Sequence, residues 1–536
     1  MRKLRVIRTT PLAACLFTLA ALLWCLPTSS AAAPRQATPA RPEVRVDEGR
    51  LLGQVHDQAD EFLGIPYAAP PVGALRFRPP RQPSPWRGER DATRQAPACR
   101  QFSPFGLRDP EAVSEDCLYL DVYRPRGTRP GQALPVLFWM HGGAYSQGTG
   151  TQFGGRTLAS LTGSVVVSVN YRLGQLGYLT LPELTHDNAY DSGSFGLMDQ
   201  IAALQWTHDN IAAFGGAPEA ITISGQSAGS GSVCAMLASP RTKGMFTRAV
   251  LQSGPCSLLQ APQRSHSQRD SEEFATAAGC PAAPTRATCL RSATAESLIA
   301  AARTHPVSGP AVGDHLLPRQ PFDAITDGDW NRVPVLIGST RAESRFFVAL
   351  STPHLTPEEY TDTINRQYGT GAAQVLEHYP LSDYDSPYLA LSTVLTDSTF
   401  ACHTHWTAGA LARQVPTYVY EFDDPQSPTL YGAQVPGVDM ANAHSAELAY
   451  LFDFTMADRP LSSGQVKLAD RMKRYWGAFL RSGNPNVRGQ TPWPTGDSGS
   501  VLELGPGSDR VSMAFASQHQ CAFWSSLPAP SPASPA

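Results

Sequence analysis

The 536-residue sequence lacks any pronounced excess of one charge. Lys and Arg together number 43 and Asp and Glu number 46, which gives a formal net charge of -3. No basic run occurs beyond the extreme N-terminus, so the electrostatic footprint of a nucleic-acid-binding protein is missing. We therefore expect no nucleic-acid partner. The sequence also holds 47 Pro and 44 Gly but no G-X-Y period and no internal repeat, which excludes collagen and solenoid architectures.

Metal-binding spacings are also missing. None of the ten cysteines forms a C-x-x-C pair, and no set of Cys and His has the spacing of a zinc site. We expect no metal and no cofactor. The sequence has no Asn-x-Ser/Thr sequon, and Arg far outnumbers Lys, which fits a bacterial origin.

Residues 1–33 have the pattern of a secretory signal peptide. Four basic residues precede an apolar stretch from Pro11 to Leu26, and the small residues from Ser29 to Ala33 form a cleavage site. The stretch has about 16 residues, fewer than the roughly 20 that span a membrane, so a stable membrane anchor is disfavoured. A lipoprotein box at Leu12 to Cys15 is a second alternative. We expect a secreted or periplasmic protein.

Eight cysteines remain after Cys15 and Cys25 leave with the signal peptide. An even number in an exported chain favours disulfides. The eight are Cys99, Cys117, Cys234, Cys256, Cys280, Cys289, Cys402 and Cys521.

One catalytic-sized unit, residues 43–524, lies between a Pro/Ala linker at 34–42 and a Pro/Ser/Ala tail at 525–536, which we expect to be disordered. Short apolar runs alternate with helical patterns such as 197–214, which predicts an α/β layered sheet with buried parallel strands. Two helix-prone stretches, 257–325 and 344–412, are candidate caps over the sheet. The apolar runs are 134–140, 165–169, 220–224, 249–252, 333–337 and 417–422.

Ser227 is the candidate nucleophile. It lies in a G-x-S-x-G turn, Gly225 to Gly229, between an apolar run and a helical pattern. The two glycines allow a tight turn that exposes the serine at a helix N-terminus, where N–H groups favour a developing anion. The motif is weak alone, and an ordinary turn serine is the alternative. The strand before it and the helix after it are what nucleophilic chemistry requires.

The partners of such a nucleophile occur in the expected order. His141-Gly142-Gly143 ends an earlier strand, where its N–H groups can form an oxyanion hole. Glu343 follows a later strand as candidate acid, and His444 follows the next as candidate base. Position alone leaves two other histidines, His403 and His405, as rivals for the base.

Longer motifs resemble the type B carboxylesterase/lipase family, which includes the cholinesterases, from about Val46 to Trp524. The matching segments include Phe62 to Pro71, Leu75 to Phe77, Glu115 to Val122, Asn170 to Gly174, Gly196 to Gln200, Ala203 to Trp206, and Asn210 to Gly216.

The resemblance implies an α/β-hydrolase fold and a Ser227, Glu343 and His444 triad. It places the oxyanion-binding N–H groups on Gly143, Ala144 and Ala228. It also implies the disulfides Cys99–Cys117, Cys280–Cys289 and Cys402–Cys521. Cys234 and Cys256 remain as either a fourth disulfide or two buried thiols.

Three departures from the family pattern stand out. Ala144 replaces the third oxyanion glycine, Gln226 replaces the acidic residue before the nucleophile, and the loop from Cys99 to Cys117 contains no Trp. The resemblance places Glu447 behind the triad. A cationic leaving group would find neither a carboxylate nor an indole face, so we expect no preference for choline esters.

We interpret the chain as a secreted serine hydrolase that cleaves small carboxylic esters through an acyl-enzyme. An inactive adhesion or scaffold member of the same fold is one alternative. A peptidase, lipase, lactonase or polyester esterase with the same triad is another. The sequence leaves the natural ester and the oligomeric state open.

Overall fold

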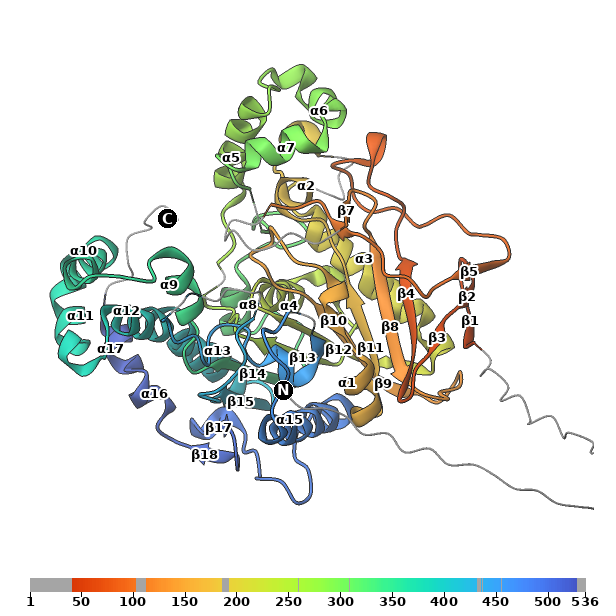
Figure 1. Ribbon diagram of the computed structural model, residues 1–536. Helices are drawn as coiled ribbons and strands as arrows, with labels where there is room; N and C mark the ends of the chain where they lie inside the picture. The colour runs from red at the N-terminus through yellow and green to blue at the C-terminus, as the bar shows by residue number, and fades with distance from the viewer. Residues whose placement is uncertain are drawn as a thin grey trace, which may run out of the picture. The chain divides into compact units, whose positions relative to one another are not determined.

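The computed structural model describes residues 41–102, 112–185, 192–258, 260–307, 309–430, 435, 437–454 and 456–527 (Figure 1). The expected signal peptide and most of the expected linker therefore lie outside the described residues, as does the tail from 528 onward. The described part belongs to one compact unit that begins at Arg41.

The unit is built on an 11-stranded sheet with the order β18-β17-β15-β14-β13-β12-β9-β11-β8-β4-β3. Neighbouring strands from β11 to β17 are parallel, and the strands at both edges pair antiparallel. The mostly parallel sheet predicted from the apolar runs is confirmed. The strands are β3 (Gln54–Val55), β4 (Ala59–Pro66), β8 (Tyr119–Pro125), β9 (Leu134–Met140), β11 (Val165–Val169), β12 (Gly216–Gln226), β13 (Arg248–Gln252), β14 (Val335–Thr340), β15 (Thr417–Phe422), β17 (Val501–Leu504) and β18 (Arg510–Ser512).

Smaller ladders lie beside the main sheet. They are formed by β1 (Glu43–Val46), β2 (Gly49–Leu52) and β5 (Glu89–Asp91), by β6 (Ala98–Cys99) and β7 (Val113–Ser114), and by β10 (Phe153–Gly154) and β16 (Asp453–Phe454).

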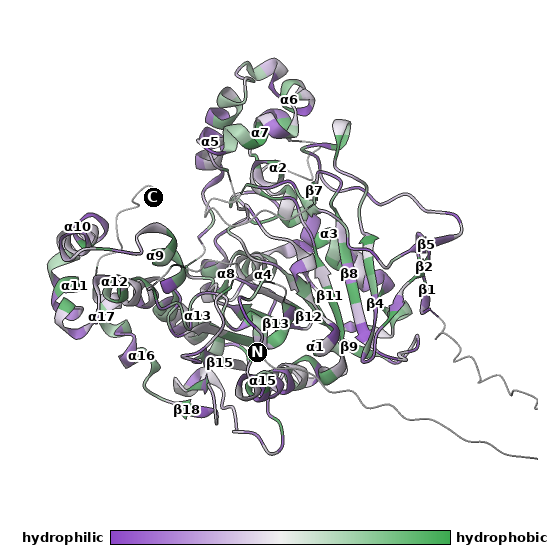
Figure 2. Cartoon of the chain, viewed as in Figure 1, coloured by the Kyte–Doolittle hydropathy of each residue, from purple (hydrophilic) through white to green (hydrophobic). Residues whose placement is uncertain are grey.

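The sheet separates two hydrophobic cores, because successive side chains of a strand point to opposite faces. On β9, Phe138 belongs to one core and Trp139 to the other. The first core lies under α3 and α4, and the second under α1 and α15. Figure 2 shows hydrophobic colouring along β8 and hydrophilic colouring on the outer helices α5 and α10. The covering helices are α1 (Arg156–Thr162), α3 (Phe195–Asn210), α4 (Ala228–Ala238) and α15 (Ser463–Ser482).

The two helix-prone stretches form helices, of which α5–α7 and α9–α12 lie away from the sheet in Figure 1, whereas α8 packs on α4 and α13 packs on β14 and β15. The second stretch packs its own third core with the C-terminal helices, including Tyr360, Tyr379 and Trp524. The first stretch carries α5 (Arg264–Ala277), α6 (Ala283–Ser292), α7 (Ala295–Ala302) and α8 (Pro321–Asp327). The second carries α9 (Arg345–Ser351), α10 (Pro357–Tyr368), α11 (Ala372–His378), α12 (Pro387–Leu395), a π-helical turn (Thr396–Ala401) and α13 (Cys402–Ala412).

The remaining helices are short. They are α2 (Gly174–Tyr178), α14 (Leu448–Leu451), α16 (Phe515–Gln518) and α17 (Cys521–Ser526). Several boundaries differ from the sequence pattern; β12, for example, extends from Gly216 to Gln226, beyond the run 220–224 on both sides. β14 begins at Val335 because Pro334 precedes it and cannot donate to a strand partner, and α17 continues two residues beyond the expected domain end at Trp524.

Four disulfides join the eight cysteines. They are Cys99–Cys117, Cys234–Cys256, Cys280–Cys289 and Cys402–Cys521. The last spans 119 residues and ties the C-terminal segment to α13. Cys234 on α4 meets Cys256 just after β13, since β12 and β13 are adjacent strands.

We expect no titratable thiol in the unfolded, unreduced protein starting at residue 34, because each of its eight cysteines has a disulfide partner. Thiol titration in denaturant, followed by mass spectrometry of non-reduced peptides, measures this. Two thiols mapped to Cys234 and Cys256 would contradict the fourth pairing.

Candidate active site

Ser227 lies at the turn between β12 and α4. Its backbone has φ 57° and ψ -125°, a strained conformation for a residue with a side chain. Its N–H donates to the carbonyl oxygen of Gln252 at 2.9 Å, which fixes the turn to the end of β13. This conformation places Ser227 beyond the end of the strand and at the N-terminus of the helix. The residue is partly exposed there.

The glycines of the G-x-S-x-G motif are required by close packing. A Cβ on Gly225 would lie 2.4 Å from the carbonyl carbon of Gly229. A Cβ on Gly229 would lie 2.1 Å from the carbonyl oxygen of Met140, at the end of β9. The two glycines thus let α4 approach both strands, because neither contact has room for a side chain.

The loop after β9 approaches Ser227 from the other side. A Cβ on Gly142 would lie 3.0 Å from the Cβ of Ser227. Gly143 and Ala144 have φ values of 104° and 52°, and Ala228 begins α4. Among the described residues, the N–H groups of Gly143, Ala144 and Ala228 have no hydrogen-bond acceptor within the chain. Three donors without an internal acceptor thus lie on the two loops that meet at Ser227.

Glu343 and His444 are brought together by the loops after β14 and β15. The Nδ1 atom of His444 lies 2.5 Å from a carboxylate oxygen of Glu343, and both side chains are buried. The other carboxylate oxygen accepts the Thr340 N–H at 2.8 Å. The His444 N–H also donates to the Glu343 carbonyl at 3.1 Å. These contacts place a proton on Nδ1 and leave the lone pair on Nε2.

The side chain of Gln226, at the end of β12, contacts His444. Its amide nitrogen lies 3.1 Å from Nε2 of His444, and it donates there because Nδ1 carries the ring proton. Gln226 precedes Ser227 in the chain, so this contact directs Nε2 toward the strand end that carries the serine. The carboxamide adds no charge at this position.

Three phenylalanine rings surround the imidazole. The ring centroids of Phe347 and Phe400 lie 5.0 and 5.2 Å from that of His444, and Phe346 lies at 6.4 Å. Phe347 is partly exposed and stacks on Phe400. The sequence patterns above did not predict this cluster. The Phe346-Phe347 pair, which begins three residues after Glu343, is the sequence feature that indicates it.

Glu447 is a second buried carboxyl group near the triad residues. Gln252 donates to it at 3.1 Å. Burial, reinforced by the nearby Glu343, raises its pKa to about 8. Glu447 therefore keeps its proton at neutral pH and adds no negative charge behind His444.

The rival histidines lie elsewhere. His403, on α13, contacts the hydroxyl of Ser257 at 2.9 Å and the ring of Trp406. Burial lowers its pKa to about 4, and burial also lowers the pKa of His405. Within the described part of the chain, neither contacts Glu343 or Gln226, whereas His444 contacts both.

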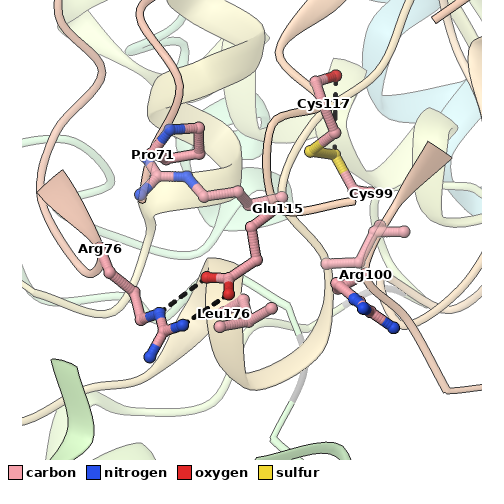
Figure 3. Close-up of a pocket in the computed structure, with 9 residues that line it drawn as sticks. Pro71, Arg76, Cys99, Arg100, Glu115, Cys117 and Leu176 are labelled. Carbon is pink, nitrogen blue, oxygen red and sulfur yellow. Dashed lines mark hydrogen bonds and ion pairs between the residues drawn. A yellow bond between two sulfur atoms is a disulfide. The ribbon is translucent and has the colours of Figure 1, made fainter. Parts of the chain in front are cut away.

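Four of the sequence motifs meet in two pairs, each joined by an ion pair away from Ser227. Arg76 donates to both carboxylate oxygens of Glu115, beside the Cys99–Cys117 disulfide (Figure 3). Arg172 likewise donates to both oxygens of Asp199 at 2.7 Å, with both side chains buried. These motif residues hold loops and helices in place, since bidentate pairs fix orientation as well as distance.

A comparison with known families identifies the chain. The model of the carboxylesterase family matches residues 40–524. The chain belongs to the carboxylesterase family. The esterase is similar to a rat (Rattus norvegicus) protein named pyrethroid hydrolase Ces2e, with 33% identity over 81% of this chain and 80% of the relative. It is also 33% identical to the crystal protein of Dictyostelium discoideum, over 86% of this chain and 87% of that protein.

Solved structures agree with this assignment. A PNB esterase superposes with a TM-score of 0.75 at 30% identity, covering 90% of this chain and 99% of that one. The esterase therefore has the α/β-hydrolase fold and is a carboxylic ester hydrolase that acts on small esters. Its four disulfides are typical of secreted or lumenal proteins.

The described residues include neither a membrane-spanning helix nor a candidate metal site. No helix among them is sufficiently long and apolar to cross a membrane. No group of three His, Cys, Asp or Glu side chains in that part of the chain could hold a metal ion.

We expect Gly229→Ala to lower kcat/KM by about 100-fold or more, since the added methyl displaces the turn that carries Ser227. Hydrolysis of a chromogenic ester measures the effect. Gly409→Ala is the matched control, because Gly409 lies exposed on α13 with no atom within 4 Å of the added Cβ. Full activity of Gly229→Ala would contradict the packing argument.

We expect the free energy of unfolding of Glu447→Gln to decrease less with rising pH than that of the wild type. Folding raises the pKa of Glu447 from 4.5 to about 8, so its contribution to the free energy of unfolding decreases as pH rises between these values. The neutral amide removes this contribution while keeping the shape. Melting temperatures between about pH 5 and 9 measure it. Parallel curves for variant and wild type would show that Glu447 is ionised in the folded protein.

Proposed function

We propose that the protein is an exported serine esterase in which Ser227 attacks the ester, His444 is the general base and Glu343 orients the histidine. The observation that carries the proposal is the 2.5 Å contact between His444 Nδ1 and Glu343, together with the contact between His444 and Gln226, the residue before the strained Ser227.

The chemistry follows from these positions. Once the Gln226 amide has released Nε2 of His444, Nε2 takes the Ser227 proton as the hydroxyl oxygen bonds to the ester carbonyl carbon, and Glu343 stabilises the resulting imidazolium. The N–H groups of Gly143, Ala144 and Ala228 receive the negative oxygen. His444 then returns the proton to the departing alcohol. Water, activated in the same way, releases the acid from Ser227.

Two apolar regions support a neutral ester as substrate. The phenylalanines around His444 stand where the alcohol receives its proton, and a phenyl or alkyl alcohol fits them. A cavity of about 120 Å³ next to the oxyanion loop is lined by Tyr145, Gly231 and Ala235, among others. We assign it to the acyl group, because Gly231 and Ala235 lie on α4 one and two turns after Ser227.

Export is supported by the N-terminal pattern and the disulfides together. Four disulfides form and persist in an oxidising compartment, and a signal peptide at residues 1–33 delivers the chain there. We place the mature protein in the periplasm or outside a bacterial cell.

We expect Ser227→Ala to retain less than about a thousandth of the wild-type kcat, because no other group can form the acyl-enzyme. Glu343→Gln and His444→Ala should each lower kcat strongly, whereas His403→Ala and His405→Ala are the mild controls. Steady-state kinetics on one ester measures all five. A tenth of the wild-type activity in Ser227→Ala would overturn the assignment, and so would equal damage from His405→Ala and His444→Ala.

We expect choline esters to have no advantage over neutral esters of the same shape. Gln226 offers no charge, and burial favours the protonated form of Glu447. Phenyl rings bind a neutral alcohol group as well as they bind a cationic one of the same shape. The measurement is kcat/KM for butyrylcholine against 3,3-dimethylbutyl butyrate at low salt. A preference of about a hundredfold for the cation, or about 2.7 kcal/mol, would contradict the prediction.

A further inference from the structure

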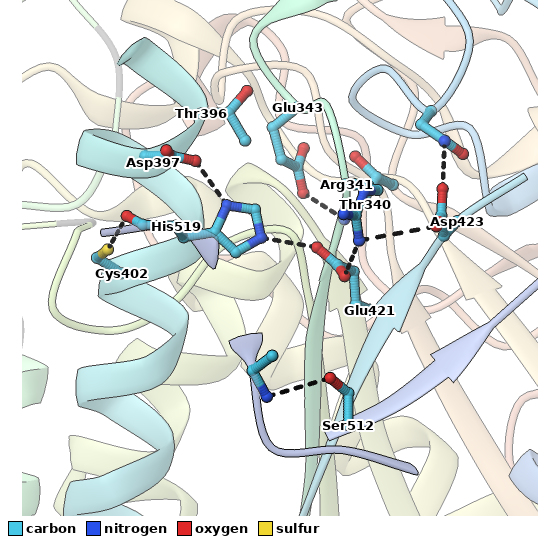
Figure 4. Close-up of polar contacts among 12 residues, drawn as sticks. Thr340, Arg341, Glu343, Thr396, Asp397, Cys402, Glu421, Asp423, Ser512 and His519 are labelled. Atoms are coloured by element: carbon cyan, nitrogen blue, oxygen red, sulfur yellow. Dashed lines mark hydrogen bonds and ion pairs between the residues drawn. The ribbon is translucent and has the colours of Figure 1, made fainter. Parts of the chain in front are cut away.

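His519 lies between two buried carboxylates on different parts of the fold. Its Nδ1 is 2.5 Å from Asp397, in the π-helical turn, and its Nε2 is 2.7 Å from Glu421, on β15 (Figure 4). All three side chains are buried. The histidine belongs to the C-terminal segment, two residues before Cys521, which the disulfide ties to α13.

The geometry sets the charge of His519. A neutral imidazole donates from one nitrogen only, so one of the two contacts would set a lone pair against a carboxylate oxygen. Both contacts are satisfied when both nitrogens carry protons. Consistently, the two carboxylates outweigh burial and raise the pKa of His519 to about 9.

Each carboxylate lies next to a support of the Glu343 loop. The second oxygen of Glu421 accepts from the guanidinium of Arg341 at 2.9 Å. Asp397 follows Thr396, whose hydroxyl accepts the N–H of Ser344 at 3.0 Å. Arg341 and Ser344 flank Glu343, so the loop is held on both sides of the acid.

The same region also holds the His444 loop. Asn442 accepts the Ala342 N–H through its carbonyl at 3.1 Å, and its side chain donates to Asp423 at 2.9 Å. Asp423 in turn lies 3.7 Å from Arg341. A shift of Arg341 would therefore move both loops that bring Glu343 and His444 together.

We propose that the His519 imidazolium is a positioning residue for the reaction: it joins the two supports of the Glu343 loop and so keeps Glu343 in register with His444. The proposal rests on the proposed role of Glu343. His519 touches neither substrate nor reacting atoms, and it acts through Glu421 and Asp397.

Other charged and titratable groups face this cluster from every neighbouring element. The hydroxyl of Tyr379, which follows α11, donates to Asp397 at 2.9 Å. Arg345 on α9 pairs with Asp439. Glu503 on β17 adds negative potential at Arg341, and Asp423 follows β15. Loss of the His519 proton changes the charge of the cluster, while Tyr379 keeps its proton because burial raises its pKa.

A polar cavity gives room for a test by substitution. It measures about 220 Å³ and is lined by Arg341, Thr396, Asp397 and His519, among others. His519→Arg can extend into this space, keep both contacts and stay charged at all accessible pH values, since a guanidinium has several donors. His519→Gln is neutral and similar in size.

The experiment measures kcat and KM for one neutral ester from about pH 6 to 10, well below the melting temperature of each variant, with circular dichroism to verify folding. We expect wild-type kcat to fall reversibly near pH 9. His519→Arg should remove that alkaline decline. His519→Gln should lower kcat by about tenfold or more at every pH, with KM changed less than about twofold.

His378→Gln is the matched control, because His378 is exposed and stacks on Phe523 of the same C-terminal segment without touching the cluster. A folded His519→Gln with the kcat of this control would overturn the proposal, and so would identical alkaline declines in wild type and His519→Arg. A purely structural role would lower the melting temperature of His519→Gln but leave kcat intact. Ser227→Ala separates the two proposals: its retained activity would overturn the proposed function, whereas a dead Ser227→Ala beside a normal His519→Gln overturns the His519 role alone.

Discussion

The strained backbone of Ser227 is the constraint on which the site depends. A positive φ with a side chain costs about 1–3 kcal/mol and persists only where the surroundings fix it. Here β9, β12 and β13 end together, and their parallel register brings Met140, Gln226 and Gln252 to the carboxyl end of the central strands. The turn at Ser227 can form there only because glycines let α4 approach these strand ends.

Buried ionisable side chains are stabilised in two different ways around these strand ends. The scaffold pairs its charges bidentately, as Arg172 does with Asp199, so that neither group is left without a partner in a low dielectric. Near Glu343, burial instead raises the pKa of the Glu447 carboxyl group to about 8, which favours its neutral form. Glu343 is the carboxylate that contacts His444 directly.

The sheet and the order of the triad candidates were predictable from the sequence, because they depend on apolar runs and on turns with fixed spacing. It also named the motifs around Arg76 and Asp199, although not their ion pairs. The phenylalanine cluster was predictable only in part: Phe346 and Phe347 closely follow Glu343, but Phe400 comes from a π-helical turn far from them in sequence. The partners of His519 were hidden for the same reason: Asp397, Glu421 and His519 meet only after the helical insertion has packed on the C-terminal segment.

The order of these parts along the chain has a consequence for biogenesis. A ribosome makes Ser227 before the midpoint of the chain, but His444 comes much later and His519 nearly last. The disulfide from Cys402 to Cys521 also waits for the end of the chain and for an oxidising environment. A nascent chain thus carries Ser227 before His444 and before its C-terminal tie. The contacts that surround Ser227 in the folded chain can therefore assemble only after translation has passed these later residues.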